Sequence, residues 1–236
     1  MLKLSSVPCM AGASVYSGPM LVDLHTHTYP GSSCSAITYR EYVNWCVDAG
    51  VEAVALTNHG DTDDLRKLGP ALAAEGVLLL HGVEISTLFG DFVVFSPDLD
   101  YLGTLRPVQD ALRPGEVPEH AALVWVHPVA GGGRSGSAYY PGLERSVAAT
   151  IEGIEVFNGN WLADRYVSQA QAIARDLGLA QTGGSDAHRV EALGRCATLL
   201  PDPVRSTADV VAALRARVTV PHRNDTERRR KRFGLF

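Results

Sequence analysis

Histidine and aspartate residues occur in this sequence at spacings that suit metal binding. His25 and His27 are two residues apart, and so are Asp186 and His188. In an extended backbone the side chains of residues i and i+2 point to the same side, so each pair can share one cation. Either pair alone is a weak indication, because a lone histidine is more often a packed or surface residue than a ligand.

Other candidate ligands stand at the ends of apolar segments elsewhere in the chain: His59, Glu84 and His127. With the two pairs they make a set of imidazoles and carboxylates that contains no Lys or Arg. Such a set would be costly to bury unpaired, whereas two or three divalent cations would satisfy it. Mixed imidazole and carboxylate ligands suit zinc, manganese or iron better than magnesium or calcium.

The elements that must position these residues alternate along the chain. Apolar runs such as 51–57 and 77–84 read as buried strands, and helical patterns separate them. Thr38 and Glu41 have capping-box spacing, and Gly178 stands where a long helix over 160–177 would end. Strands separated by helices predict an α/β fold with a parallel sheet, closed into a barrel whose strand ends meet at one mouth.

Length and composition indicate an ordinary globular protein, although length alone leaves one barrel or two small domains open. The chain has 236 residues, of which 46% are hydrophobic, and a formal net charge of −5. Residues 1–19 show neither helical nor strand periodicity and are expected to be a poorly ordered extension. Residues 20–222 hold the motifs, and residues 223–236 form a basic tail of net charge +4. No apolar run approaches the ~20 residues of a spanning helix, so we expect a cytoplasmic protein without membrane contact.

The motifs resemble those of the PHP (polymerase and histidinol phosphatase) superfamily over about 20–200. The matching segments, in order, are Asp23-Leu-His-Thr-His27, Thr57-Asn-His59, Gly82-Val-Glu84, His127-Pro128 and Gly184-Ser-Asp-Ala-His188. The resemblance implies a single distorted (β/α)7 TIM-like barrel and a phosphoesterase site with two or three metals. It also implies that His25, His27, Glu84 and Asp186 hold one metal, that Glu84 bridges to a second on His127, and that His59 and His188 serve a third.

Two positions depart from the family pattern. Family members often have a His or Asp shortly after the H-x-H pair, where this chain has a loop containing Cys34. Either the third metal is weak there or Cys34 supplies a thiolate; the alternative for Cys34 is a buried loop thiol. A histidine commonly follows the Glu motif, and here the nearest candidate ligand is Asp91, which could equally be a turn residue.

The function expected from this resemblance is hydrolysis of a small phosphomonoester, of the nucleotide or sugar phosphate class, by a metal-activated water. His59 or His188 could protonate the leaving group, and Arg134, in a glycine-rich loop, could bind the phosphate. A nuclease acting on oligonucleotides is the first alternative, favoured only by the basic tail and disfavoured by the acidic body. A metal-binding module without turnover is the second. The sequence does not indicate an oligomeric state.

Overall fold

The computed structural model describes residues 18–87, 89–108, 116–130 and 149–224. Strands and helices alternate through most of this range. In chain order the elements are β1 (Met20–Val22), α1 (Tyr39–Asp48), β2 (Ala53–Leu56), α2 (Asp63–Ala74), β3 (Leu78–Thr87), β4 (Gly90–Phe95), α3 (Leu99–Thr104), β5 (Ala122–Trp125), β6 (Gly153–Asn158), α5 (Asp164–Leu177), β7 (Ala180–Gly184), a 3₁₀ turn (Val190–Ala192), β8 (Cys196–Leu200), α6 (Thr207–Ala216) and β9 (Val220–Arg223).

The strands form two sheets. Six strands in the order β2-β3-β4-β5-β6-β7 make a curled half-barrel, and β1, β8 and β9 make a second, antiparallel sheet in the order β1-β8-β9. Single bridges, Asp23 with Val54 and Thr26 with Ala187, link the segment that begins with β1 to β2 and to the segment after β7. The predicted α/β class is confirmed, but the described strands form these two sheets rather than one continuous seven-stranded barrel.

The expectation of an all-parallel sheet is wrong at β4. This strand pairs antiparallel with both β3 and β5, whereas β2–β3, β5–β6 and β6–β7 are parallel. Parallel strands need a crossover of a dozen or more residues, and the chain between Thr87 and Gly90 is far too short for one. A hairpin there reverses the chain, so Asp91 at the start of β4 lies beside Ser86 near the end of β3.

Local sequence signals account for the helix ends. Thr38 and Glu41 form the expected capping box at the start of α1. Gly178, with φ +63°, ends α5 in the left-handed region that glycine adopts without steric cost. The sequence also predicts a short helix over 140–149, which falls almost wholly outside the described residues.

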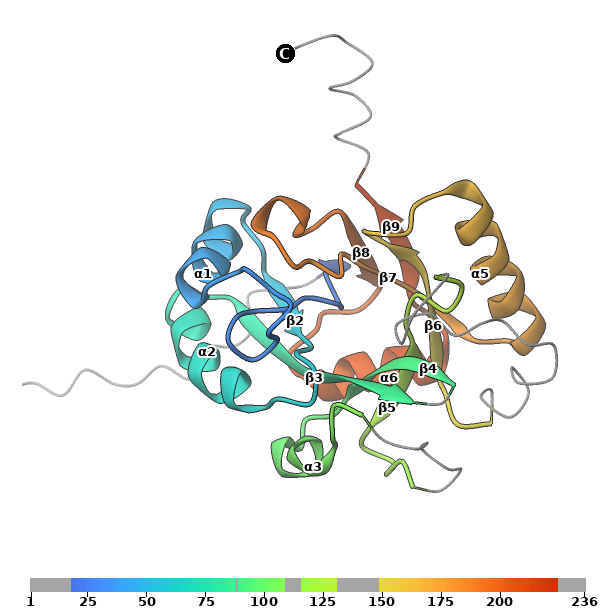
Figure 1. Cartoon of the computed structure of the whole chain (residues 1–236), viewed down its shortest axis with the longest axis horizontal. Coiled ribbons are helices and arrows are strands. Elements are labelled where there is room, and N and C mark those ends of the chain that lie inside the picture. The colour runs from blue at the N-terminus through green and yellow to red at the C-terminus, as the bar shows by residue number, and fades with distance from the viewer. Residues whose placement is uncertain (1–17, 88, 109–115, 131–148, 225–236) are drawn as a thin grey trace, which may run out of the picture.

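Two apolar clusters lie on opposite faces of the strands, because successive side chains point to opposite sides. In β2, Ala53 and Ala55 point inward, while Val54 and Leu56 belong to an outer cluster that packs beneath the helices. Figure 1 looks into the ring of strands, with α1 and α2 on one side and α5 on the other. We call the inward set the inner cluster: Met20, Val22, Leu24, Ala53, Ala55, Leu80, Val93, Phe95, Ala122, Val124, Val126, Ala180, Leu200, Val204, Val210, Val211 and Leu214.

Helix α6 supplies the last members of the inner cluster and covers the ring at the amino ends of β5 and β6. The guanidinium Nη2 of Arg215 donates to the Ala121 carbonyl, 2.9 Å away, just before β5. Leu214 lies against Gly153, the first residue of β6. The opposite end of the ring, where the parallel strands finish, is left for polar side chains.

The boundaries of the described elements run from Met20 in β1 to Arg223 in β9. Arg223 pairs with Cys196 in a β ladder, so the residue expected to begin the tail is part of the second sheet. The N-terminal extension up to residue 17 and the tail from residue 225, with Phe233, Leu235 and Phe236, lie outside the described residues. Among the described helices, none is long and apolar enough to cross a membrane.

Candidate metal centre

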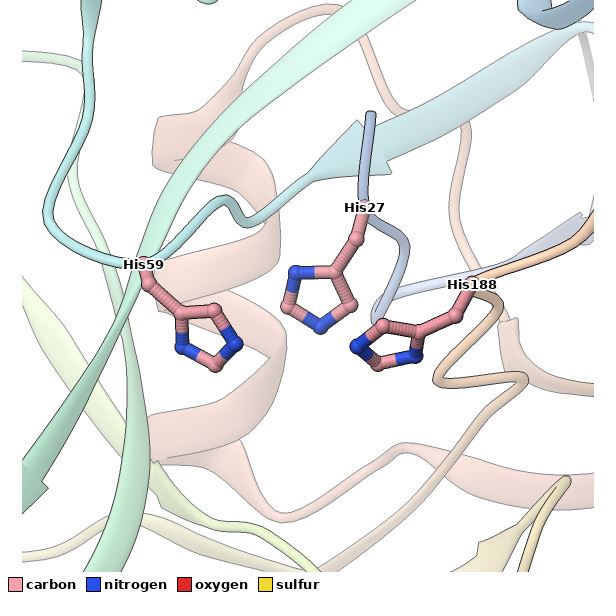
Figure 2. A group of neighbouring side chains, drawn as sticks. All are labelled: His27, His59 and His188. Atoms are coloured by element: carbon pink, nitrogen blue, oxygen red, sulfur yellow. The ribbon is translucent and has the colours of Figure 1, made fainter. Parts of the chain in front are cut away.

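All eight metal ligands expected from the sequence lie together at the carboxyl end of the parallel strands. They form four overlapping groups in which the possible ligand atoms lie within 4.8 Å of one another. The groups are His27, His59 and His188; His25, His27 and Glu84; His25, His127 and Asp186; and Glu84, Asp91 and His127. Figure 2 shows the first of these, with the three imidazole rings close together although they come from three separate chain segments.

Glu84 is at the middle of this cluster, and its two carboxylate oxygens face different imidazoles. Its Oε2 lies 3.2 Å from His27 Nε2, 3.2 Å from His59 Nδ1 and 3.4 Å from His25 Nε2. Its Oε1 lies 3.2 Å from His127 Nε2. This is the arrangement that a carboxylate bridging two cations would require.

Asp186 lies close to a second, partly shared set of imidazoles. Its Oδ1 lies 3.3 Å from His27 Nε2, 3.5 Å from His188 Nδ1 and 3.6 Å from His25 Nε2. The backbone of Asp186 has φ +50°, and that of His127 has φ +33°, values that residues with a side chain seldom adopt. Such strain is typical of functional sites, where the surrounding structure holds a side chain in a required direction.

Asp91, for which the sequence left a turn residue as the alternative, is part of the cluster. It is buried, and its Oδ2 lies 3.9 Å from His127 Nδ1. The antiparallel hairpin between β3 and β4 brings it there, which the expectation of parallel strands could not have shown. Burial is the main reason that the pKa of Asp91 is raised, and nearby Glu84 adds to it.

The donor atoms fit cations better than they fit one another. His27 Nε2, His127 Nδ1 and Asp91 Oδ1 are buried without a hydrogen-bond partner among the described residues. His27 Nε2 is near two carboxylate oxygens, yet it forms a hydrogen bond with neither. Buried polar atoms are nearly always satisfied, so several unsatisfied ones within one cluster of imidazoles and carboxylates indicate a metal site.

The charges in the cluster are strongly coupled. Burial lowers the pKa of His25, but Asp186, Glu155 and Glu84 outweigh it and hold that pKa well above its usual value. Burial acts in the same sense on His127, and Glu84 raises the pKa of His127 to about 9. Burial alone would raise the pKa of Glu84, whereas His25 and the neighbouring imidazoles hold it well below its usual value.

A hydrogen-bond network behind the cluster fixes the orientation of His27. The Ser32 hydroxyl donates to Asn58 Oδ1 at 3.0 Å, so it accepts from His27 Nδ1, 3.1 Å away, and from the His59 backbone N–H, also at 3.1 Å. Asn58 in turn donates to Asp64 Oδ2 at 2.9 Å. With its proton on Nδ1, His27 presents the lone pair of Nε2 to the cluster.

Glu155 is a buried carboxylate of the site that the sequence reasoning passed over. Its Oε1 lies 3.1 Å from His25 Nδ1, and its Oε2 accepts from the His127 backbone N–H at 3.1 Å and from Asn158 at 2.8 Å. A carboxylate behind a ligating histidine fixes its ring and raises its basicity. The signal was the position of Glu155 near the end of the apolar segment Ile151–Phe157, and the next residue, Asn158, donates to Asp186 Oδ2 at 3.2 Å.

Close packing around Gly184 leaves no room for a side chain. A Cβ at this position would lie 2.4 Å from His25 Cβ and 2.6 Å from Glu155 Oε1. Glycine is therefore required at the end of β7 so that the segment carrying Asp186 can approach the segment carrying His25.

The remaining candidates lie elsewhere or outside the described range. Arg134, expected to bind phosphate, falls among residues 131–148, which the structure does not describe. His81 is half-buried on β3, His120 and His222 are exposed, and none of these three belongs to the candidate ligand groups. His59 and His188 keep 34% and 31% of their side-chain surface exposed, so they form the solvent edge of the cluster.

The fold and the site together define an α/β half-barrel with a metal-binding cluster at its mouth, and known proteins share this architecture. Over residues 165–219 the chain matches the PHP-associated family model. That match covers less than a quarter of the chain, and the likeness to the PHP-like structures described below shows a shared fold. No curated protein sequence matches the chain.

Solved structures resemble the chain over most of its length. PsfC from Pseudomonas syringae is 21% identical, with a TM-score of 0.66 over 89% of this chain and 94% of that one. A two-domain protein from Bacteroides vulgatus, which contains a predicted PHP-like metal-dependent phosphoesterase, is 19% identical, with a TM-score of 0.63 over 88% and 65%. A proposed metal-dependent phosphoesterase from Bifidobacterium adolescentis is 17% identical, with a TM-score of 0.60 over 83% and 96%.

Proposed function

We propose that the protein is a metal-dependent phosphoesterase that hydrolyses a small phosphomonoester. The observation that carries this proposal is the position of Glu84, whose two oxygens face separate sets of imidazoles at the mouth of the ring. Phosphoryl transfer needs positioning and charge stabilisation more than covalent catalysis, and two adjacent cations provide both.

His25, His27 and Asp186 would hold one cation, and Glu84 would bridge to a second held by His127 and Asp91. Two or three zinc, manganese or iron ions bound there would polarise the phosphoryl group and supply an activated water at neutral pH. Glu155 and Ser32 would keep the His25 and His27 rings in place through their Nδ1 atoms. His59 and His188, at the solvent edge, are the candidate proton donors to the leaving group. Either one can act in this way only when it is not bound to a third cation.

The acidic character of the chain supports a small substrate over a polynucleotide. The net charge is −5, and a groove that follows a nucleic-acid backbone should be basic. We propose that Arg134 contributes to phosphate binding and that no membrane is involved. A structure from Chromobacterium violaceum, described as an amidohydrolase with bound sulfate and no metal, has a TM-score of 0.55 to this chain. Sulfate has the tetrahedral shape of phosphate, which supports an anion site in this fold. The name amidohydrolase makes amide hydrolysis the competing reaction.

A substrate panel tests the proposal. Mononucleotides, sugar phosphates, a single-stranded oligonucleotide and simple amides would be assayed with manganese and with zinc, for wild type and for Glu84→Gln. The matched control is Asp48→Asn, an exposed carboxylate at the end of α1. We expect phosphate release from monoesters that Glu84→Gln abolishes and Asp48→Asn leaves intact. Cleavage of the oligonucleotide or the amides alone would contradict the proposed reaction, and turnover unaffected by Glu84→Gln would contradict the site.

A further inference from the structure

Cys34 lies directly beside one of the four candidate ligand groups. Its Sγ is 3.1 Å from Nε2 of His188, which with His27 and His59 forms the group at the solvent edge. The sequence left two interpretations of Cys34 open, a ligand or a loop thiol. Neither the family model nor the structural likeness assigns it a role.

The protonation of His188 is fixed by its other neighbour. His188 Nδ1 lies 3.0 Å from the backbone carbonyl oxygen of Asp186, and a carbonyl oxygen can only accept a hydrogen bond. In the neutral imidazole Nδ1 therefore carries the proton, and Nε2 presents a lone pair toward the sulfur of Cys34. In the metal-free protein, a lone pair and a thiol at this distance form a hydrogen bond. When a cation replaces the thiol proton, the nitrogen and the sulfur become two adjacent ligands.

A second observation points to bound cations at this end of the cluster. His27 is fully buried, and its Nδ1 is occupied by Ser32, while its Nε2 has no hydrogen-bond partner among the described residues. Figure 2 shows its ring between those of His59 and His188. An unsatisfied buried nitrogen beside two partly exposed imidazoles is typical of a bound cation rather than of packing.

The loop that carries Cys34 is held against both histidines by backbone contacts. Ala36 N–H donates to the His188 carbonyl at 2.9 Å, and the Ser35 hydroxyl donates to the His27 carbonyl at 3.1 Å. Within the loop, Ser35 N–H donates to the Ser32 carbonyl at 3.0 Å. The residues after Cys34 are thus fixed to the segments that carry His188 and His27.

We propose that Cys34 supplies a thiolate to a third cation bound by His59 and His188, the two partly exposed imidazoles of the edge group, while His27 Nε2 faces the first cation. On binding, the thiol proton leaves to solvent and a sulfur–metal bond forms, so no oxidant or reductant is required. A sulfur ligand makes this site prefer zinc or cobalt over manganese or magnesium. The inference rests on the metal centre of the proposed function but not on hydrolysis.

Cobalt(II) substitution tests the proposal without measuring activity. The metal-free Cys9→Ser protein, which lacks the one thiol outside the described residues, would be titrated with cobalt alone and compared with Cys9→Ser/Cys34→Ser. The other two thiols, Cys46 and Cys196, are buried. We expect a near-ultraviolet sulfur-to-cobalt charge-transfer band that the second variant loses, while visible ligand-field bands from nitrogen and oxygen sites persist in both.

Alkylation supplies a second readout. In Cys9→Ser, iodoacetamide should modify Cys34 at least about tenfold more slowly when zinc is bound, and His188→Ala should remove that protection. Ligand-field bands without a charge-transfer band, or alkylation unaffected by zinc, would overturn the role of Cys34 while the metal centre stands. No cobalt bands of either kind would overturn the metal centre and this inference together.

Discussion

The two ends of the ring interior are built on the same strands and differ in almost every physical respect. At the end closed by α6, Leu80, Phe95 and Val124 pack among other apolar side chains and need no partner beyond one another. At the mouth, the same strands or their extensions carry Glu84, Asp91 and His127, and buried polar atoms remain unsatisfied. The closed end stabilises the fold by itself, whereas the mouth keeps buried nitrogen and oxygen atoms that cations would satisfy.

This division is expressed within single strands. In β3, Leu80 and Glu84 are four residues apart and point to the same side, yet one lies in the inner cluster and the other in the metal centre. An inward position in a strand is therefore not sufficient to decide between packing and chemistry; the distance from the strand's end decides it. Substitutions at the two ends should accordingly have separable effects, on stability at one and on metal binding at the other.

The largest effect on metal binding is expected from a substitution of Glu84. Glu84→Gln keeps the shape of the side chain but removes the charge that faces His27, His59 and His127. We expect the metal content to fall from at least two equivalents per chain to less than one, and hydrolysis to fall by more than about 100-fold. Elemental analysis of protein expressed with added zinc or manganese measures the first effect. Full metal content in the variant would contradict the bridging role.

Phe95→Ala should produce the opposite result at the closed end. Phe95 is almost completely buried in the inner cluster, and removing a buried phenyl ring costs about 3–5 kcal/mol of the free energy of unfolding. Denaturant unfolding measures this loss, and elemental analysis of the folded variant should still give at least two metals per chain. A variant that loses metal while keeping its stability would show that the two ends are not independent.

Ser32→Ala tests whether a residue that only holds a ligand in place affects metal binding. It removes the acceptor that holds the His27 proton on Nδ1, so we expect metal affinity to fall by about 10–100-fold. Ser33→Ala, at the exposed neighbouring position, is the control and should bind metal as wild type does. Competition with a chromogenic chelator measures both affinities; equal affinities would show that this network does not position the ligand.

The ionisable groups at the mouth should also make the stability of the metal-free protein depend on pH in an unusual way. The pKa of His127 is raised to about 9, above the value of about 6.5 expected in the unfolded chain. Its contribution to stability is therefore fully present below about pH 6.5 and is lost as the pH rises through about 9. We expect the melting temperature of chelator-treated protein to fall over this interval, and metal binding at pH 7 to release protons. Calorimetry in buffers of different ionisation enthalpy would detect the release, and its absence would contradict this assignment.

The smallest effect is expected from removing the basic tail after Asn224. The described elements end with β9 at Arg223, and most of the tail's charge lies beyond it. We expect the melting temperature and phosphate release from small esters to stay nearly unchanged, because like charges in the tail repel rather than pack. Oligonucleotide cleavage that is strongly salt-sensitive and is lost on truncation would favour the nuclease alternative.

The sequence determined which residues could bind metal, because their types and strand-end positions are local properties. His25 and His27, at spacing i and i+2, had to point to one side of an extended segment, and Asp186 had to follow a strand that ends in glycine. The capping box at Thr38 and the helix stop at Gly178 were equally local and are confirmed. Each of these follows from backbone geometry over a few residues.

Only the tertiary structure decided how these local pieces meet. The hairpin that brings Asp91 to His127, the two separate sheets, the contact between Cys34 and His188, and the place of Glu155 behind His25 all join segments far apart in the sequence or reverse the expected chain direction. Such contacts depend on strand order and on the short connection after Thr87. Hydrophobic periodicity in the sequence predicts neither of them. Hydrophobic pattern specifies which side of a strand is buried, but strand pairing specifies which polar groups share that burial.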